Sequence, residues 1–544
     1  MALSISHVLP DTSEPVLDTT VGGILRDAAR EAPDAVALIE GVADRAGRRR
    51  WTYAELLAAA ERAALALRSR FEPGEQVAIW APNIPEWVIV EFGAALAGVT
   101  LVTVNPAYKP AEVRYVLTQS QASGLLMVPE FRGNPMAAAL ESVRAELPAL
   151  REVVDLTAFD GFLASGDAFA AAGGVLPEVT PDDAAQIQYT SGTTGFPKGA
   201  RLSHRAITNN ARLSMGRIGF GADDTWVNPM PMFHTAGCVV ATLGPVQARG
   251  RIVLAPWFDP TLFFDLVDEE GGSTTLLVPT MLLACLEHPT FGERDLGTLR
   301  SVVSGGATVP AELVRRVEKQ MGVTFDIVFG QTESGPVITQ TFPSDAPEDT
   351  AGTLGRPLPQ TEVSIRSVGD DEIVPIGAVG EICTRGYLVM QGYFEMPEAT
   401  AAAISADGWL RTGDLGTMDE RGYCRIAGRV KDMIIRGGEN IYPREIEDLL
   451  FGHPAVADVA VVGIPDERWG ESVVAFVRPA AAGTTAAVGE LFDFCREHLA
   501  SYKTPRTWVV VDQFPTTASG KIQKYVLRER LVGGEFPPEA VTSK

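Results

Sequence analysis

The sequence predicts an α/β protein with a large N-terminal domain and a smaller α+β domain at the C-terminal end. The chain has 544 residues, more than the ~250–300 residues at which a single hydrophobic core stops growing. Up to about residue 350, apolar strand-like runs alternate with helical patterns, as a sheet covered by helices requires. After Gly355 the runs become short and are separated by Gly and Asp, which is typical of antiparallel strands.

Local signals place the individual elements. Thr52 and Glu55 have the spacing of a capping box, so a helix is expected to begin after Thr52. The apolar stripe of this helix comprises Leu56, Ala60, Ala64 and Leu67. Further strands are expected at residues 77–80, 100–104, 252–254, 276–278, 302–303 and 326–329, with a helix at 86–96.

The C-terminal third has a different pattern of predicted elements. Short strands are expected at residues 362–366 and 381–384, with a hairpin turn at 419–422. A helix at 444–450, strands at 456–462, 473–477 and 508–511, and a further helix suffice for a small α+β domain of roughly 110 residues.

Composition excludes several classes of protein. The net charge of −23 argues against nucleic acid as a partner, because phosphate backbones are bound through clustered Lys and Arg. The five cysteines are widely spaced without a CxxC pair, which disfavours a disulfide framework or a zinc site. No signal peptide is evident, and the most apolar stretch, residues 92–104, is too short for a transmembrane helix. We therefore expect a cytoplasmic protein.

Residues 189–199 form the most informative segment. They contain three glycines, four Ser or Thr hydroxyls and Lys198 after a strand-like run. Glycines let backbone N–H groups converge on an anion, and the hydroxyls and the lysine add donors and charge. This composition indicates a polyphosphate loop, although a surface turn uses the same residues. It is not a Walker A loop, because Gly199 follows Lys198.

Together with six further segments in the same order, this loop resembles the adenylate-forming (ANL) superfamily. The six segments are residues 231–234, 304–307, 329–333, 412–414, 428–432 and 519–521. The chain looks most similar to the acyl-CoA synthetase (AMP-forming) branch and, within it, to medium-chain enzymes. The resemblance implies an N-terminal domain at residues 1–428, with two α/β subdomains and an antiparallel β subdomain. It further implies a hinge at 429–431 and a mobile C-terminal domain at 432–544.

The resemblance also implies the activity. ATP and a carboxylic acid would give acyl-AMP and pyrophosphate, and coenzyme A would then take the acyl group and release AMP. Lys521 would be the catalytic lysine, Thr332 would contact phosphates, Glu333 would hold Mg²⁺, and Lys431 would be the hinge residue. The implied ATP/AMP contacts are Thr190, Ser191, Gly192, Thr193, Thr194, Gly195, Lys198, Gly305, Gly306, Ala307, Phe329, Gly330, Gln331, Thr332, Asp414 and Arg429.

The same comparison implies the sites of the acid and of coenzyme A. The acid would lie near His234, Val239, Gly335 and Val337, where Gly237, Gly305 and Gly335 are interpreted as leaving room. Coenzyme A would contact Gly437, Gly438, Glu439 and Lys503. The apolar character of the acid segments and the lack of a fixed charge for an amino group favour a medium-chain fatty acid, and hence a role in fatty acid metabolism.

Several alternatives stay open. An aryl- or alicyclic-acid:CoA ligase would use the same machinery with another pocket. An enzyme that loads a carrier protein would share the first step, and a nucleotide-binding protein without catalysis would leave Lys521 unexplained. The sequence leaves the oligomeric state open, including a homodimer.

Overall fold

The computed structural model describes residues 2–190, 197–307, 309–437, 439–466, 468–480, 488–516 and 522–536, and the backbone of 539 and 540. The chain divides into two compact units. The larger comprises Val8–Val363 and Cys383–Leu410, and the smaller comprises Met1–His7, Ser364–Ile382 and Arg411–Lys544. This division groups the antiparallel strands with the C-terminal residues, and the domain boundary expected at 429–431 stays a prediction.

The first sheet of the larger unit has nine strands in the order β16-β15-β14-β13-β12-β10-β11-β2-β3. Its middle strands from β14 to β2 are parallel, and the pairs at both edges are antiparallel. The strands are β2 (Val36–Glu40), β3 (Arg50–Thr52), β10 (Thr225–Asn228), β11 (Arg251–Leu254), β12 (Thr274–Leu276), β13 (Ser301–Gly305), β14 (Thr324–Phe329), β15 (Thr339–Gln340) and β16 (Arg356–Pro357).

The second sheet has seven strands in the order β19-β9-β8-β5-β4-β6-β7. Strands β8, β5, β4, β6 and β7 are parallel, whereas β9 runs antiparallel to both β8 and β19. The strands are β4 (Gln76–Trp80), β5 (Thr100–Thr103), β6 (Gly124–Met127), β7 (Glu152–Asp155), β8 (Ala184–Thr190), β9 (Lys198–Ser203) and β19 (Gly392–Tyr393).

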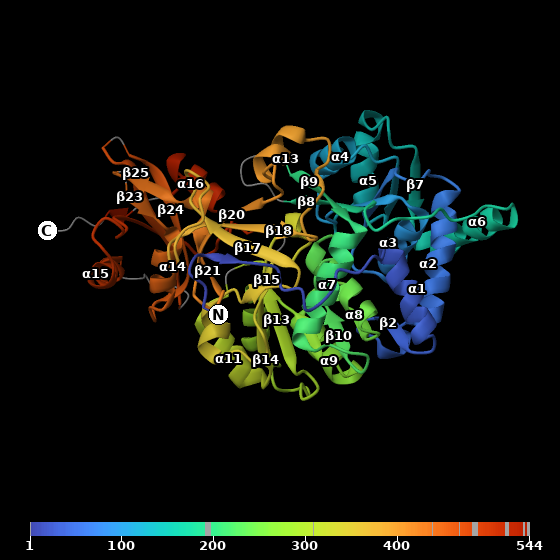
Figure 1. The fold of residues 1–544 in the computed structure, drawn as a ribbon, viewed down its shortest axis with the longest axis horizontal. Helices are drawn as coiled ribbons and strands as arrows, with labels where there is room; N and C mark the ends of the chain where they lie inside the picture. The colour runs from blue at the N-terminus through green and yellow to red at the C-terminus, as the bar shows by residue number, and fades with distance from the viewer. Residues whose placement is uncertain are drawn as a thin grey trace. The chain divides into compact units, whose positions relative to one another are not determined.

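Helices cover these sheets, and α1, α2 and α3 pack side by side (Figure 1). The α-helices of the larger unit are α1 (Val21–Glu31), α2 (Tyr53–Arg68), α3 (Pro85–Ala97), α4 (Pro110–Gln119), α5 (Met136–Val143), α6 (Phe159–Ala171), α7 (His204–Ile218), α8 (Gly244–Gln247), α9 (Pro260–Glu270), α10 (Pro279–Leu286), α11 (Ala311–Met321), α12 (Pro347–Gly352) and α13 (Pro397–Ala403). A π-helix, η4 (Ala236–Leu243), precedes α8, and short 3₁₀ turns are η1 (Arg45–Gly47), η2 (Arg144–Glu146), η3 (Leu156–Ala158) and η5 (Thr332–Ser334).

Helix α2 confirms the local reading of the sequence. The Thr52 hydroxyl accepts the backbone N–H of Glu55 at 3.2 Å, and the Glu55 carboxylate accepts the N–H of Thr52 at 2.8 Å. The predicted apolar stripe of this helix is fully buried. It lies in a core that also encloses Trp80 and Trp87. The hydrophobic stripe and its cap therefore fix both the start and the buried face of the helix.

One predicted strand is misplaced. The strand expected at 276–278 is observed as β12, which ends at Leu276. Val278 instead precedes α10, which begins at Pro279. Proline fixes φ at a helical value and suits the first position of a helix, so the apolar run is divided before it.

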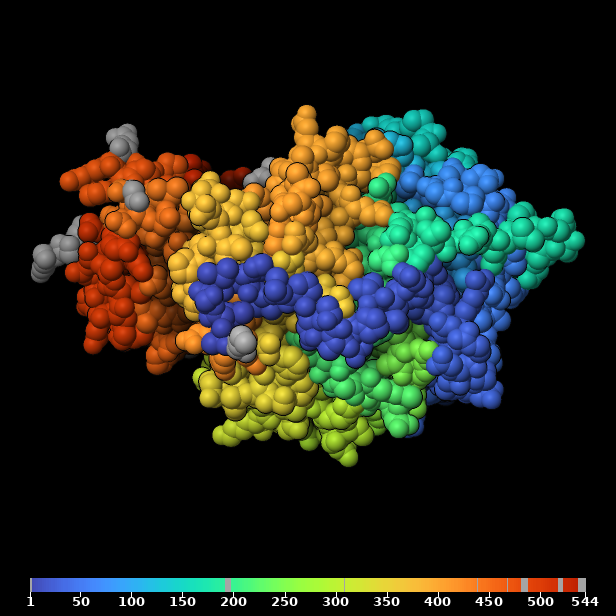
Figure 2. All heavy atoms as spheres, viewed as in Figure 1, coloured from blue at the N-terminus to red at the C-terminus, as the bar shows by residue number. Residues whose placement is uncertain are grey.

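The N-terminal segment of the larger unit runs over the protein surface beside α7 (Figure 2). The Asn209 side chain bonds to both backbone groups of Leu17, accepting its N–H at 2.7 Å and donating to its carbonyl at 2.9 Å. Arg212 pairs with Glu14 at 3.1 Å. Residues 8–20 are thus bonded to a helix almost two hundred positions away in sequence.

Two further sheets consist mainly of residues of the smaller unit. The first has the order β1-β17-β18-β20-β21, and the second has the order β23-β22-β25-β26-β27 with β24 paired to β25. The strands are β1 (His7–Val8), β17 (Thr361–Arg366), β18 (Gly380–Gly386), β20 (Leu410–Met418), β21 (Cys424–Arg429), β22 (Ile434–Arg436), β23 (Glu439–Ile441), β24 (Val456–Asp466), β25 (Gly470–Pro479), β26 (Thr507–Val510) and β27 (Glu539–Ala540). The helices are η6 (Val430–Asp432), α14 (Pro443–Phe451), α15 (Val488–His498) and α16 (Lys524–Val532). The expected antiparallel hairpin is confirmed, since Gly422 donates to the carbonyl of Asp419 at 2.9 Å between β20 and β21.

Candidate active site

The predicted phosphate loop connects two paired strands. Strand β8 ends at Thr190 and β9 begins at Lys198, and these two residues are partners in the antiparallel ladder. The Thr190 hydroxyl also donates to the Lys198 carbonyl at 3.4 Å. Among the predicted site residues, Ser191, Gly192, Thr193, Thr194, Gly195, Gly438 and Lys521 lie outside the described residues. The ends of the loop are therefore fixed by the ladder.

The predicted nucleotide segments after β13 and β14 lie side by side. The two strands are parallel neighbours, and Gly305 is the register partner of Val328. Their carboxyl ends lead into Gly306-Ala307 and into the segment 329–333. In open α/β sheets this edge is where ligands bind. The structure thus brings together two segments that the sequence only placed in order.

Steric constraints explain the glycines of this edge. A Cβ atom on Gly330 would lie 2.0 Å from the carbonyl oxygen of Pro336, and one on Gly305 would lie 2.3 Å from that of Val328. Gly306 has φ +74°, which L-amino acids with a side chain rarely adopt. A side chain at Gly305 or Gly330 would displace the neighbouring backbone, and one at Gly306 would be strained by its positive φ.

Lys198 and Glu333 both contact Tyr393, although they belong to different segments. The Tyr393 hydroxyl donates to Glu333 Oε1 at 2.8 Å. The Lys198 ammonium lies 4.8 Å from the centroid of the same ring. Glu333 is 8% exposed, and among the described residues no cation forms an ion pair with it. Burial, followed by the neighbouring Glu333 carboxylate, raises the pKa of the Tyr393 hydroxyl far above its ordinary value, so the hydroxyl keeps its proton and donates it in the hydrogen bond to Glu333.

The predicted acid segments are apolar and tightly packed. Val239 lies on the π-helix η4 and is fully buried, and Val337 is held by two hydrogen bonds to the Asn210 side chain, at 2.6 and 2.9 Å. His234 is half-buried, its carbonyl accepts the N–H of Gly237 at 2.9 Å, and its ring lies 4.5 Å from that of Phe233. Both segments therefore contribute apolar side chains that are buried in the core.

The interpretation of the glycines here as leaving room was wrong. A Cβ on Gly237 would lie 2.3 Å from the carbonyl oxygen of Pro231, and one on Gly335 would lie 3.0 Å from that of Leu388. Gly305, described above, is equally confined. These glycines allow backbone segments to approach each other closely, so they do not enlarge a pocket.

In the smaller unit, the two predicted nucleotide contacts pair with each other. Asp414 and Arg429 are register partners on β20 and β21, and Arg429 Nε donates to Asp414 Oδ1 at 2.8 Å. The preceding turn is held by Glu381, which accepts the N–H of Gly413 at 2.8 Å. Burial raises the pKa of the Glu381 carboxyl. The pair presents a half-exposed guanidinium next to a nearly buried carboxylate.

Gly437, one of the predicted coenzyme A residues, contacts an aromatic and basic cluster formed by Trp469, Arg436 and Arg468. Gly437 has φ +63° and donates to the carbonyl of Trp469 at 2.7 Å, and a Cβ there would lie 2.9 Å from the indole. The guanidinium groups of Arg436 and Arg468 lie 5.2 and 5.0 Å from the indole ring. Lys503 pairs with Glu445 at 2.7 Å.

The other residues of this region are on short elements. Lys431 lies in η6 and Glu439 begins β23. Four residues at these sites were missed from the sequence: Tyr393, Asn210, Glu381 and Trp469. Each acts on a partner far away along the chain, and no local spacing signals such a contact.

Comparisons with known proteins identify the family. The family model described as "AMP-binding enzyme" matches residues 25–394, and "AMP-binding enzyme C-terminal domain" matches residues 445–521. The chain belongs to this family of adenylate-forming enzymes, as the motifs predicted. The fold class is confirmed as well.

Individual relatives extend the likeness over nearly the whole chain. It is 36% identical to the medium-chain acyl-CoA ligase ACSF2, mitochondrial, of Rattus norvegicus, over 97% of this chain and 90% of that protein. It is 30% identical to ATP-bound MatB from Rhodopseudomonas palustris, with a TM-score of 0.85 over 94% of this chain and 99% of the other. It is 27% identical to the anthranilate CoA ligase AuaEII in complex with anthranoyl-AMP, with a TM-score of 0.84 over 96% and 99%. The chain is an AMP-forming acid:CoA ligase of the acyl-CoA synthetase class, as predicted.

In the part of the chain that the structure describes, no helix is long and apolar enough to cross a bilayer.

Proposed function

We propose that this enzyme converts a medium-chain fatty acid to its acyl-CoA thioester through an acyl-adenylate. The observation that carries the proposal is the convergence of Lys198 and Glu333 on Tyr393, beside the parallel ends of β13 and β14. Lys198 pairs with the carboxyl end of β8 and Glu333 follows the carboxyl end of β14, and one positive and one negative group at such strand ends suit a metal-bound polyphosphate.

In the first step, the chain would hold ATP and bring a carboxylate to its α-phosphate. Lys198 and the backbone of the loop that it terminates would neutralise phosphate charge, and Thr332 would donate to a phosphate oxygen. Lys521 would stabilise the charge that develops as carboxylate oxygen displaces pyrophosphate. Asp414 would accept the ribose hydroxyls, with Arg429 as a second contact.

Glu333 suits a magnesium ion. Its Oε1 accepts the Tyr393 hydroxyl, and Oε2 has no hydrogen-bond partner among the described residues. Mg²⁺ in nucleotide sites takes one or two carboxylates together with substrate phosphates, so a single buried carboxylate at this edge fits the ion. When bound, the ion would screen the phosphate charges.

In the second step, coenzyme A would approach the smaller unit near Gly437. The narrow turn at Gly437 would let the pantetheine arm pass close to backbone. The cluster of Arg436, Trp469 and Arg468 offers cations and an indole face to a phosphorylated nucleotide. Lys503 would join them after leaving Glu445.

Alternation between the two steps would use the domain arrangement expected from the sequence. Residues 1–428 would bind ATP and acid, 429–431 would form the hinge with Lys431 as its pivot, and 432–544 would move. This motion would withdraw Lys521 and bring the Gly437 turn to the thioester-forming site.

The chemistry of the acid is supported by the apolar character of the predicted acid segments and by the relatives. Val239 and Val337 are buried and apolar, and the rat relative is described as a medium-chain acyl-CoA ligase. The second candidate is an aryl-acid:CoA ligase, which the likeness to AuaEII favours. A carrier-loading enzyme is the third.

The cellular setting belongs to the same proposal. We place the enzyme in the cytoplasm on the basis of its five cysteines, which are widely spaced along the sequence without a CxxC pair and are all buried. The ACSF2 relatives are described as mitochondrial. A homodimer stays a hypothesis that size-exclusion chromatography with light scattering would decide.

Pyrophosphate release over a panel of acids tests the proposed function. Straight-chain, branched and aromatic acids would be supplied with MgATP, with and without coenzyme A, and acyl-CoA would be measured by mass spectrometry. Medium straight chains should give the highest kcat/KM and a thioester product. Preference for aromatic acids would favour the second candidate. Pyrophosphate release without any thioester would favour carrier loading, and no release with any acid would refute the proposal.

A further inference from the structure

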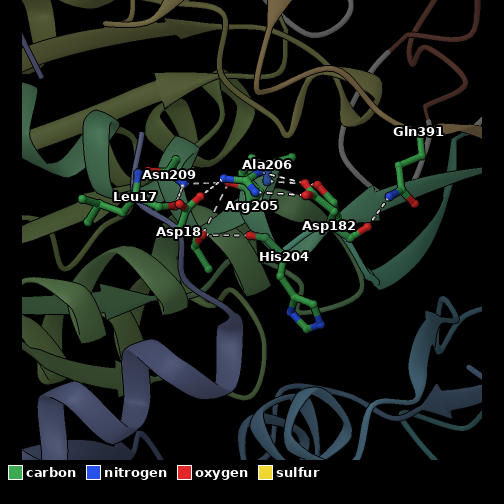
Figure 3. Close-up of polar contacts among 10 residues, drawn as sticks. Leu17, Asp18, Asp182, His204, Arg205, Ala206, Asn209 and Gln391 are labelled. Carbon is green, nitrogen blue, oxygen red and sulfur yellow. Dashed lines mark hydrogen bonds and ion pairs between the residues drawn. The ribbon is translucent and has the colours of Figure 1, made fainter. Parts of the chain in front are cut away.

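Strand β19 attaches a distant segment to the strand that follows the phosphate loop. Tyr393 is the ladder partner of Ala200 on β9, and Phe394 donates to the carbonyl of Gly199 at 2.8 Å. The Gln391 side chain adds a bond to the carbonyl of Asp182 at 2.6 Å (Figure 3). The position of Tyr393 relative to Lys198 is therefore set by backbone pairing.

The same segment holds Glu333 at two points. The backbone N–H of Met390 donates to the Glu333 carbonyl at 2.9 Å, and the Tyr393 hydroxyl donates to Glu333 Oε1 at 2.8 Å. A carboxylate on a free side chain samples several rotamers, whereas one oxygen fixed by a hydroxyl leaves the second in a defined place.

The ring of Tyr393 also contacts the Lys198 ammonium. A cation 4.8 Å from an aromatic centroid is within the range of a cation–π contact. Tyr393 thus touches both charged groups that the proposed function assigns to metal-bound ATP. Its partner Glu333 forms no ion pair within the described part of the chain, so the Tyr393 hydroxyl is the group that holds Oε1 there.

We propose that Tyr393 is a positioning residue for metal-bound ATP, orienting the Glu333 carboxylate through its hydroxyl and Lys198 through its ring. This inference rests on the proposed function, because it assigns Tyr393 to the same nucleotide site. The inference assigns separate roles to the hydroxyl and to the ring of Tyr393. Loss of the hydroxyl should weaken the metal, and loss of the ring should additionally weaken the nucleotide.

Calorimetric titration tests the hydroxyl. Mn²⁺ would be titrated into protein saturated with a non-hydrolysable ATP analogue, for the unsubstituted chain and for Tyr393→Phe. A hydrogen bond to a charged group predicts about a tenfold loss of Mn²⁺ affinity in Tyr393→Phe. Metal-free binding of the analogue should change by less than about twofold. The Mg²⁺ concentration for half-maximal pyrophosphate release should rise by the same factor, with kcat recovered at saturating Mg²⁺.

Tyr53→Phe is the matched control. Tyr53 is a buried tyrosine of the larger unit, and its hydroxyl donates to the Gly250 carbonyl at 2.6 Å, without a contact to Lys198 or Glu333 among the interactions of the described residues. This variant also loses the hydrogen bond of one tyrosine hydroxyl and should keep the Mn²⁺ affinity of the unsubstituted chain. Tyr393→Leu, which lacks the ring, should lose metal-free analogue affinity as well.

A double-mutant cycle tests whether Tyr393 acts through Glu333. Adding Tyr393→Phe to Glu333→Gln should cost little further Mn²⁺ affinity, because the carboxylate to be oriented is gone. Full additivity of the two losses would overturn the inference. So would a Tyr393→Phe variant with unchanged Mn²⁺ affinity, or one that loses metal and metal-free binding equally. If the unsubstituted chain bound no metal–nucleotide at all, the proposed function itself would fall.

Discussion

Acidification should destabilise the larger unit through one buried histidine. His204 begins α7 and is 1% exposed. Its Nδ1 accepts the backbone N–H of Val21, at the start of α1, at 3.2 Å. Figure 3 shows its ring directed away from the ion pairs of its neighbour Arg205. A protonated ring carries hydrogen on both nitrogens, so it would oppose this N–H and lose the bond.

The expected size follows from the pKa. Burial lowers the pKa of His204 to about 4, against an opposing effect of the Asp183 carboxylate, and an unfolded histidine titrates near 6.5. Between these values the unfolded chain binds the proton and the folded chain does not. Stability is therefore complete above pH ~6.5 and is lost as the pH falls towards 4. Between pH 7.5 and 5.0 the loss from this residue is about 2 kcal/mol.

The assay compares the unsubstituted chain with His204→Asn. The asparagine oxygen can replace Nδ1 as an acceptor but does not titrate. Urea denaturation at pH 7.5 and 5.0 should show that the unsubstituted chain loses about 2 kcal/mol more than the variant. Groups other than His204 that titrate in this pH range contribute equally to the loss in both proteins, so their contributions cancel in the comparison. Equal losses in the two proteins would refute the reasoning, because His204 would then not be held neutral by the fold.

Three further substitutions address the site. Lys521→Ala should reduce adenylate formation by at least about a hundredfold and leave thioester formation from supplied acyl-AMP largely intact; equal loss of both steps would contradict its role. Lys431→Pro should impair thioester formation more than pyrophosphate release, as measured by the ratio of the two rates, because proline restricts the hinge; an unchanged ratio would count against a hinge there. Gly392→Ala should lower the unfolding free energy by about 1–3 kcal/mol, because φ is +131° and a Cβ would lie 2.8 Å from Thr400 Cγ2; thermal denaturation at an unchanged midpoint would disprove this.

Much of the fold was predictable because its signals are local. The capping box at Thr52 and the apolar stripe behind it gave both the start and the buried face of α2. The parallel strands of the α/β sheets appeared as short apolar runs. Errors occurred where one apolar run contained two elements, as at Val278, which belongs to the start of α10 and not to β12.

The sequence predicted which motifs form the site, but it did not predict how their side chains contact one another. Motif order placed Gly305 and Phe329 in neighbouring segments, and the parallel pairing of β13 with β14 confirmed that they are close. The contact of Tyr393 with Glu333 joins residues sixty positions apart. The periodic patterns of helices and strands indicate local structure and do not predict such a contact. The function of Gly237 was also misjudged, because sequence alone does not show which backbone faces a glycine.

The bonded N-terminal segment matters for anyone who expresses this enzyme. The family match begins at residue 25, so a clone trimmed to that boundary would discard Leu17 and Val21. The buried side chains of Asn209 and His204 would then lose these backbone partners. Burying polar groups that have lost their hydrogen bonds is costly, and such a shortened protein should aggregate although every recognised catalytic motif is still encoded.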